Sequence, residues 1–229
     1  MKVRTRWHIF ENPHAVAEEA ARRVREAAQR AISDRGVFRI VLAGGRTPRD
    51  MHLLLASADT DWTCWRVYFG DERCLPAHDS ERNSEAAKVA LLNQVPIPAQ
   101  NIHPIPAELG AEAAAVAYAP LVAAAFPFDV VTLGVGEDGH TASLFPGRVY
   151  PVAENVHAVH DAPKPPPDRV SLSSSSLSRA REVLILATGA GKRDAVAAWR
   201  AGDALPVASV AGETAVNVLL DRDAWGDLR

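Results

Sequence analysis

The sequence has little cysteine, no strong excess of charge of either sign and no long apolar run. Its two cysteines, Cys64 and Cys74, are too few for a disulfide framework or a four-cysteine zinc site, so a reducing, cytoplasmic setting is expected. The chain has 25 lysines and arginines against 28 acidic residues, a net charge of −3, and therefore lacks the positive field that drives nonspecific nucleic-acid binding. This balance still allows a local basic pocket for a small anion.

Neither a membrane span nor a signal peptide is expected. The most apolar stretch, residues 111–128, is rich in alanine and is interrupted by Tyr118, Pro120 and Pro127, whereas a span needs roughly 20 apolar residues. The basic residues near the start are not followed by the apolar run of a signal peptide. We therefore expect neither a membrane nor a nucleic acid as a partner.

The 229 residues have the composition of a globular protein, with 48% hydrophobic and 23% charged residues. We expect a single domain over residues 1–229, with a monomer favoured although the sequence leaves the oligomeric state open. Apolar runs alternate with helical patterns, which predicts an α/β fold, a mainly parallel Rossmann-like sheet with helices on both faces. Strands are expected at 7–10, 37–43, 65–69, 128–133, 152–159, 170–173, 182–187 and 215–220.

The helices are expected between these strands, over 13–35, 80–93 and 112–125 and after residues 48 and 192. Asn12 and Thr47 are the predicted N-caps of the first two helices, each followed by a proline at the first helical position. Pro120 is a point at which the helix of 112–125 could break. Ser173 is expected to end a strand and to cap a helical turn.

Four polar, glycine-containing loops directly follow apolar strands of the predicted sheet, at residues 44–49, 70–74, 134–141 and 189–192. Parallel sheets bind ligands beyond the carboxyl ends of their strands. If all four strands are parallel, these loops share one rim and form one site.

The loop after the strand of 37–43 reads Gly44-Gly45-Arg46-Thr47-Pro48 and leads into a helix. Glycines allow close approach of the backbone, and free N–H groups at a helix start favour a phosphate; an ordinary turn with a good cap is the alternative. The loop lacks the Gly-Lys-Ser/Thr ending of a Walker A motif. Asp71, Glu72 and Arg73 follow the next strand, either as a structural ion pair or as groups presented to a substrate.

The segment Gly136–Thr141 is the strongest local signal. His140 can take and release a proton near neutral pH, and Asp138 can orient its ring; a capping loop with a surface histidine is the alternative. No histidine spacing near this loop indicates a metal site. Arg169 and Lys192 lie in or beside rim loops. Lys192 opens a helix, where the dipole disfavours a cation unless an anion is bound, and a solvated lysine is the alternative.

Together these segments resemble the 6-phosphogluconolactonase family of the pentose phosphate pathway, within the superfamily of glucosamine- and galactosamine-6-phosphate isomerases. The resemblance covers nearly the whole chain and rests on residues 42–48, 70–76, 79–83, 134–147, 162–172 and 189–192. The departures are small: Ala43, Arg46 and Glu137 stand where the family usually has Ser, Ser and Pro.

The resemblance implies hydrolysis of 6-phospho-D-glucono-1,5-lactone to 6-phosphogluconate without a metal or a cofactor. It implies His140 as the general base on water, Asp138 as the group that orients it, and Arg73 as a stabiliser of negative charge or a ligand of the phosphate. The phosphate is expected to bind Gly44, Gly45, Arg46, Thr47, Arg169 and Lys192, and Asp71 is a further substrate-binding residue.

Two other functions are considered. The related amino-sugar phosphate isomerase-deaminases share the glycine loop and the Asp-Gly-His turn, but they carry a carboxylate five residues after the histidine, where this chain has Phe145. A noncatalytic sugar-phosphate sensor would keep the phosphate loop but would not need Asp138 and His140. The pair therefore favours an enzyme.

Overall fold

The main sheet of the computed structural model has six strands, all parallel. The structure describes residues 5–151, 153–212 and 216–226. The expected strand positions at residues 152 and 215 and the basic residues Lys2 and Arg4 lie outside it. The strand order is β1-β9-β8-β5-β2-β3. The bounds are Thr5–Phe10 for β1, Phe38–Leu42 for β2, Trp65–Phe69 for β3, Phe128–Gly134 for β5, Ala180–Ala187 for β8 and Val216–Asp221 for β9. The predicted parallel α/β sheet is confirmed.

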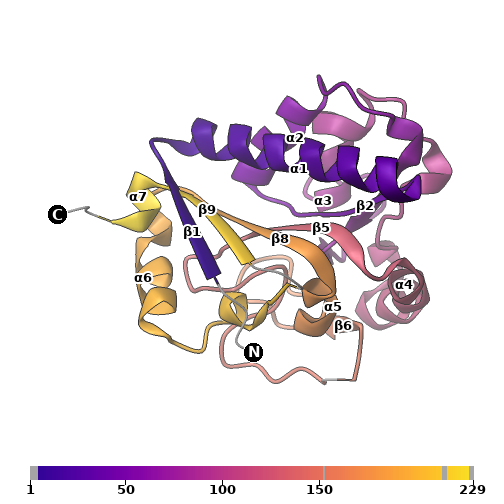
Figure 1. The fold of residues 1–229 in the computed structure, drawn as a ribbon. Helices are drawn as coiled ribbons and strands as arrows, with labels where there is room; N and C mark the ends of the chain where they lie inside the picture. Colours follow the sequence, from indigo (N-terminus) through magenta and orange to yellow (C-terminus); the bar gives the residue numbers. More distant parts are fainter. Residues whose placement is uncertain (1–4, 152, 213–215, 227–229) are drawn as a thin grey trace.

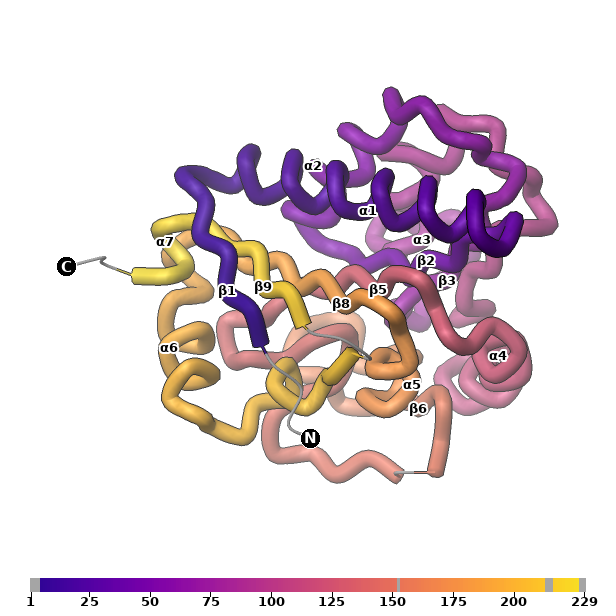
Figure 2. The backbone as a smooth tube through the Cα atoms, in the orientation of Figure 1, coloured from indigo at the N-terminus to yellow at the C-terminus, as the bar shows by residue number. Residues whose placement is uncertain are grey.

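Helices lie on both faces of this sheet (Figure 1). One face carries α1 (Pro13–Arg35) and α2 (Arg46–Leu55), and the other α5 (Ser174–Ser178) and α6 (Arg193–Ala201). As predicted, the Asn12 side chain caps α1, accepting a hydrogen bond from the backbone N–H of Ala15, and Ser173 caps α5. Figure 2 shows the first and last strands, β1 and β9, side by side, with the short α7 (Arg222–Trp225) following β9. Within the described residues, no helix is long and apolar enough to cross a membrane.

A second sheet of three antiparallel strands stands beside the first, and the sequence pattern did not indicate it. Its order is β4-β7-β6, with β4 at Asp71–Arg73, β7 at Arg169–Leu172 and β6 at Val156–Val159. In its register Arg73 lies opposite Arg169. The second sheet thus brings two chain segments that are distant in sequence to the rim of the first sheet.

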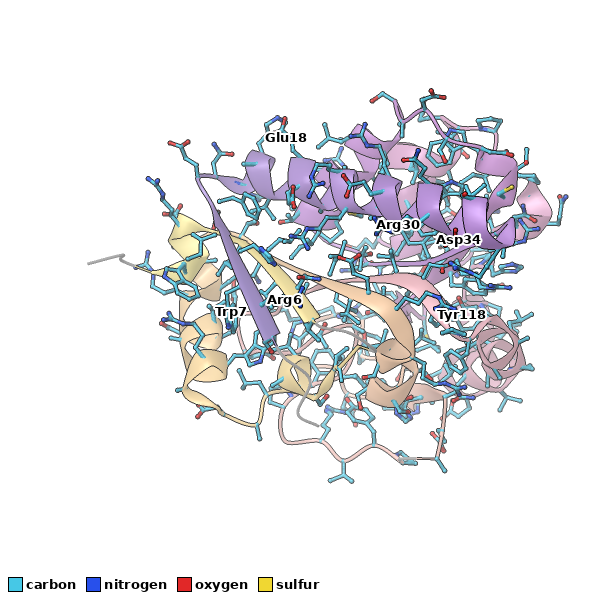
Figure 3. All side chains as sticks on the ribbon, viewed as in Figure 1. Arg6, Trp7, Glu18, Arg30, Asp34 and Tyr118 are labelled. Atoms are coloured by element: carbon cyan, nitrogen blue, oxygen red, sulfur yellow. The ribbon has the colours of Figure 1, made fainter. Side chains whose placement is uncertain are left out.

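The helix α4 (Ala111–Ala125) runs through Pro120 without the break that the proline suggested. Pro120 lacks the N–H that would bond to the carbonyl of Val116, and its ring crowds that carbonyl. Val116 is on the exposed side of the helix, 77% exposed, where water can replace the lost bond. On the buried side of this helix lies Tyr118, which is labelled in Figure 3. Its hydroxyl accepts a hydrogen bond from the N–H of Phe69 and donates one to the carbonyl of His103. Tyr118 thereby ties α4 to the carboxyl end of β3.

The expected helix over 80–93 is shorter and less regular than the pattern predicted. It consists of α3 (Asn83–Ala87) and a π-helical turn at Lys88–Leu92. The buried carboxylate of Glu72 accepts hydrogen bonds from the backbone N–H groups of Asn83 and Ser84, which fixes where α3 starts. A residue of β4, and not the local pattern, therefore sets this boundary.

Candidate active site

A cleft of about 410 Å³ opens at the carboxyl edge of the main sheet. The ends of β2, β3, β5 and β8 all contribute to it, as the four-loop argument predicts. Every site residue predicted from the sequence except Asp138 lines the cleft: Gly44, Gly45, Arg46, Thr47, Asp71, Arg73, His140, Arg169 and Lys192. The imidazole and the glycine turn therefore do share one cavity.

Asp138 lies beside His140 and outside the cleft lining. Its Oδ1 is 2.5 Å from Nδ1 of His140 and accepts a second hydrogen bond, of 3.1 Å, from the backbone N–H of His140. Burial favours the neutral form of this carboxyl, but the hydrogen bonds from His140 outweigh burial and lower the pKa of Asp138. With Nδ1 facing a carboxylate, the imidazole leaves Nε2 as its basic atom.

Two neighbours hold this pair in place. A Cβ atom at Gly136 would lie 1.9 Å from Nδ1 of His140 and 2.5 Å from Oδ1 of Asp138, so only glycine fits beneath them. On the other side, the ring of Phe145 lies 4.9 Å from the His140 ring, centroid to centroid. The imidazole is thus packed into one orientation, with its side chain 23% exposed.

The glycine loop reaches the cleft at the start of α2. The N-cap is Gly45, with a φ of 102° and no side-chain cap, so the prediction of Thr47 as N-cap was wrong. The reason is a distant partner: the Thr47 hydroxyl lies 2.5 Å from the hydroxyl of Thr188, at the end of β8. The first N–H groups of α2 are consequently free of a side-chain cap, as anion binding requires.

Asp71 is a buried carboxyl, 8% exposed, and is the first residue of β4. Its Oδ2 accepts a hydrogen bond of 2.7 Å from the Ser143 hydroxyl and its Oδ1 one of 3.0 Å from the Asn83 amide. Burial raises the pKa of Asp71 in spite of the Ser143 hydrogen bond. A polar group held so firmly at the cleft wall suits the recognition of a substrate hydroxyl.

Glu72 and Arg73 have different roles. Glu72 is fully buried and accepts hydrogen bonds from three backbone N–H groups, which makes it the structural member of the Asp-Glu-Arg segment. Arg73 donates through Nη1 to the carbonyl of Glu81 at 2.5 Å and lines the cleft. Glu72 therefore has a structural role as a backbone acceptor and not as an ion pair with Arg73. Contact of Arg73 with a substrate stays a prediction.

The basic residues of the cleft include Arg169, which is 7% exposed. It donates to the carbonyls of Lys164, Pro165 and Pro166, and burial lowers its pKa. Lys192 precedes α6, as expected, and forms no ion pair with any described residue. Lys164, a rim cation in the sequence, also lines the cleft, with Nζ 3.8 Å from Oε2 of Glu137.

Sequence reasoning missed three contributors to the cleft: Asn83, Ser143 and Thr188. Asn83 and Thr188 line it, and Ser143 supports Asp71. A Cβ atom at Gly44 would lie 2.0 Å from Oδ1 of Asn83, so this asparagine packs directly on the glycine turn. Thr188 directly follows β8, and the strand-end rule would have found it. In the part of the chain that the structure describes, no three histidine, cysteine or acidic side chains are grouped as metal ligands.

Comparison with known proteins gives consistent matches. The model of the family "Glucosamine-6-phosphate isomerases/6-phosphogluconolactonase" matches residues 11–219. A 6-phosphogluconolactonase from Mycobacterium tuberculosis is 39% identical over 239 residues, which cover 96% of this chain and 97% of the relative. The crystal structure of a 6-phosphogluconolactonase from Thermotoga maritima superimposes with a TM-score of 0.89 at 25% identity, covering 96% of this chain and all of that one.

A monomeric glucosamine-6-phosphate deaminase also superimposes, with a TM-score of 0.83 over 96% of this chain and 98% of that one. At 18% identity this likeness concerns the fold alone.

Proposed function

The chain belongs to the family of glucosamine-6-phosphate isomerases and 6-phosphogluconolactonases, and from that premise we propose that it hydrolyses 6-phospho-D-glucono-1,5-lactone to 6-phosphogluconate. The observation that carries the proposal is the single cleft in which an imidazole oriented by a carboxylate shares its walls with an uncapped helix start and two basic side chains. A lactone with a phosphate at its far end needs the imidazole to activate water and the helix start with its basic side chains to hold the phosphate.

In the proposed reaction Nε2 of His140 takes a proton from water while the oxygen of that water adds to the lactone carbonyl carbon. Asp138 stabilises the imidazolium that results. When the tetrahedral intermediate collapses, the bond from the carbonyl carbon to the ring oxygen breaks, and the imidazolium returns its proton to that oxygen. The products are a hydroxyl and a carboxylic acid, and the acid then releases the second proton of the water to solvent and becomes a carboxylate. This sequence needs no metal or cofactor. General base catalysis of this kind contributes about 10²–10⁴-fold.

The remaining residues bind and position the substrate. Gly44, Gly45, Arg46 and Thr47 offer the start of α2 to the phosphate, and Arg169 and Lys192 add positive charge. Arg73 adds positive charge at the cleft wall beside Asp71, where it favours the substrate anion and the negative charge that develops on the carbonyl oxygen. Because the phosphate is anchored away from the reacting carbon, its binding energy orients the ring for attack.

The deaminase reaction is disfavoured by one side chain. The position five residues after His140 holds Phe145, whose ring packs on the imidazole and lies 5.8 Å from the guanidinium carbon of Arg169. Ring opening of an amino sugar would need a carboxylate there. A cytoplasmic location and a monomeric state stay predictions from the sequence.

The proposal is tested in a pH-stat on freshly prepared 6-phosphogluconolactone, with spontaneous hydrolysis subtracted. Glucosamine 6-phosphate is assayed for ammonia release in parallel. We expect acid production from the lactone and no ammonia. Ammonia release without acid production would replace the lactonase by an isomerase-deaminase, and activity on neither compound would favour a sensor.

A further inference from the structure

A second cavity, of about 350 Å³, lies next to the Gly44–Gly45 turn, and we call it the rear cavity. Gly44 and Asn83, which touch one another, border both the rear cavity and the catalytic cleft. Arg49, His52 and Arg82 line the rear cavity and not the catalytic cleft. The two cavities also share Ala43, Gly45, Arg46 and Arg73, and they differ in their remaining side chains.

Unpaired buried donors gather at the rear cavity. Within residues 5–151, 153–212 and 216–226, the buried side-chain nitrogens and oxygens without a hydrogen-bond partner are Nε2 of His52, Nε of Arg73 and Nε of Arg82. All three residues line this cavity, and His52 and Arg82 are only 2% and 4% exposed. Buried polar groups in native proteins almost always have a partner. Their convergence on one cavity indicates that it receives a group rich in hydrogen-bond acceptors.

The partners of Arg82 account for its other nitrogens. Nη1 lies 2.8 Å from Oε2 of Glu108, and Nη2 donates to the carbonyl of Ile105 at 2.7 Å. Nε is 3.6 Å from Oε2 of Glu72, which is ion-pair range but too long for a hydrogen bond. The charge of Arg82 is therefore balanced, and only its Nε donor remains available.

Arg46, Arg49 and Arg73 line the rear cavity without an ion pair to another described residue, and they outnumber the carboxylate of Glu81 in the same lining. Arg46 and Arg49 belong to the first turn or so of α2, where the positive end of the helix dipole disfavours cations. That turn carries no acidic residue and no side-chain cap. An anion in the rear cavity would compensate the guanidinium group of Arg49, which lines this cavity and not the catalytic cleft.

We propose that the rear cavity is a second anion site, which binds one tetrahedral oxyanion of the size of phosphate separately from the phosphate of the substrate. Guanidinium groups match the paired oxygens of such an ion in charge and in geometry. Burial lowers the pKa of His52 to about 4, so at neutral pH this side chain contributes an N–H donor and no charge. We take the oxyanion to be free phosphate, and two arms of one experiment distinguish it from the phosphoryl group of 6-phosphogluconate.

In the first arm, inorganic phosphate is titrated by calorimetry into protein already saturated with 6-phosphogluconate, while the Nε2 resonance of His52 is followed by NMR. We expect one phosphate to bind and the His52 resonance to shift. In the second arm, 6-phosphogluconate is titrated into the free protein, and we expect a single equivalent that leaves the His52 resonance in place.

The matched variants are Arg49→Gln, at the rear cavity, and Arg30→Gln, an exposed arginine on α1 (Figure 3). Loss of one charged donor should weaken phosphate binding about tenfold or more in Arg49→Gln. Arg30→Gln should bind phosphate as the wild type does. Arg30 and other arginines line a separate cavity near the first residues of β1 and β8. The Arg30→Gln variant therefore shows whether phosphate binds in that cavity instead.

Three results would overturn the proposal. Absence of phosphate binding and of any His52 shift would mean that water satisfies the three donors. Equal phosphate affinity in Arg49→Gln and the wild type, or a loss in Arg30→Gln alone, would place the ion elsewhere. A His52 shift produced by 6-phosphogluconate itself would make the rear cavity part of the substrate site. Should 6-phosphogluconate not bind at all, phosphate titration of the free protein and its variants still tests the rear cavity, and the pH-stat assay tests the proposed function independently.

Discussion

A single carboxylate oxygen of Asp138 accepts hydrogen bonds from both the imidazole and the backbone N–H of His140. The ring is therefore fixed relative to its own backbone as well as to the carboxylate. The opposite nitrogen, Nε2, has no hydrogen-bond partner among the described residues and belongs to a ring that lines the cleft. This geometry suits a base that must take a proton from water at one place only.

The first prediction concerns the base. His140→Ala should lower the catalysed rate of lactone hydrolysis by about 10²–10⁴-fold, because the water loses its proton acceptor. The fold should survive, since the side chain is partly exposed and makes no other hydrogen bond in the described structure. The measurement is the pH-stat rate together with a circular dichroism spectrum. His14→Ala, on the exposed surface of α1, is the matched control. A folded His140→Ala variant with wild-type turnover would exclude this residue as the base.

The second prediction concerns the group that orients the base. Asp138→Asn keeps an oxygen that can accept from His140 but removes the charge that stabilises the imidazolium, so kcat should fall about tenfold or more while KM stays nearly constant. Asp138→Ala, which removes the acceptor as well, should lower kcat further. The measurement is the full dependence of the rate on lactone concentration. A change in KM alone would show that Asp138 acts in substrate binding.

The third prediction concerns phosphate recognition. Lys192→Ala should raise KM for the phosphorylated lactone about tenfold or more, because a charge-assisted hydrogen bond to the phosphate is lost. KM for unphosphorylated glucono-1,5-lactone should hardly change. Lys88→Ala, whose lysine pairs with Glu85 outside the cleft, serves as the control. Equal effects on both lactones would mean that Lys192 does not contact the phosphate.

The fourth prediction concerns metal ions. Prolonged treatment with EDTA followed by desalting should leave the rate of lactone hydrolysis unchanged, because the proposed water activation uses the imidazole of His140 and not a metal-bound hydroxide. The measurement is the rate before and after treatment at equal protein concentration. Loss of activity that returns on adding a divalent cation would contradict the metal-independent mechanism.

The strands and the rim of the cleft were predictable because their signals are local. Buried runs such as those of β2, β5 and β8 need no partner information to be recognised as strands. Once the strands are taken as parallel, their carboxyl ends lie on one edge, and the loops at 44–49, 134–141 and 189–192 are brought together without further assumptions. The shared location of His140 and the glycine turn follows from this rule.

What could not be predicted depends on contacts between distant residues. Thr47 fits the pattern of an N-cap, but its hydroxyl meets Thr188, 141 positions away, and the cap passes to Gly45. The pairing of β4 with β7 places Arg169 opposite Arg73, and β4 is too short to be recognised from alternation. The place of Asn83 in the cleft lining likewise depends on its packing against Gly44. Such partners are set by packing of the whole chain and leave no local signature.

The fifth prediction concerns the buried His52, whose pKa burial lowers from its ordinary value of 6.5 to about 4. In the unfolded chain this imidazole binds a proton below pH 6.5, whereas in the folded protein it does so only below about 4. Between these values the unfolded state binds more protons, so the free energy of unfolding must fall as the pH falls. From pH 7.5 to pH 5 the contribution of this one group amounts to about 2 kcal/mol.

His52→Gln removes this titration. The variant should therefore lose about 2 kcal/mol less of unfolding free energy than the wild type over the same pH change, whatever its stability at pH 7.5. The measurement is urea unfolding at both pH values in phosphate-free buffer, because an anion in the rear cavity would favour the imidazolium and reduce the difference. His14→Gln, at an exposed position, should follow the wild type. If the free energy of unfolding fell equally in the wild type and in His52→Gln, His52 would accept a proton as readily in the folded protein as in the unfolded chain.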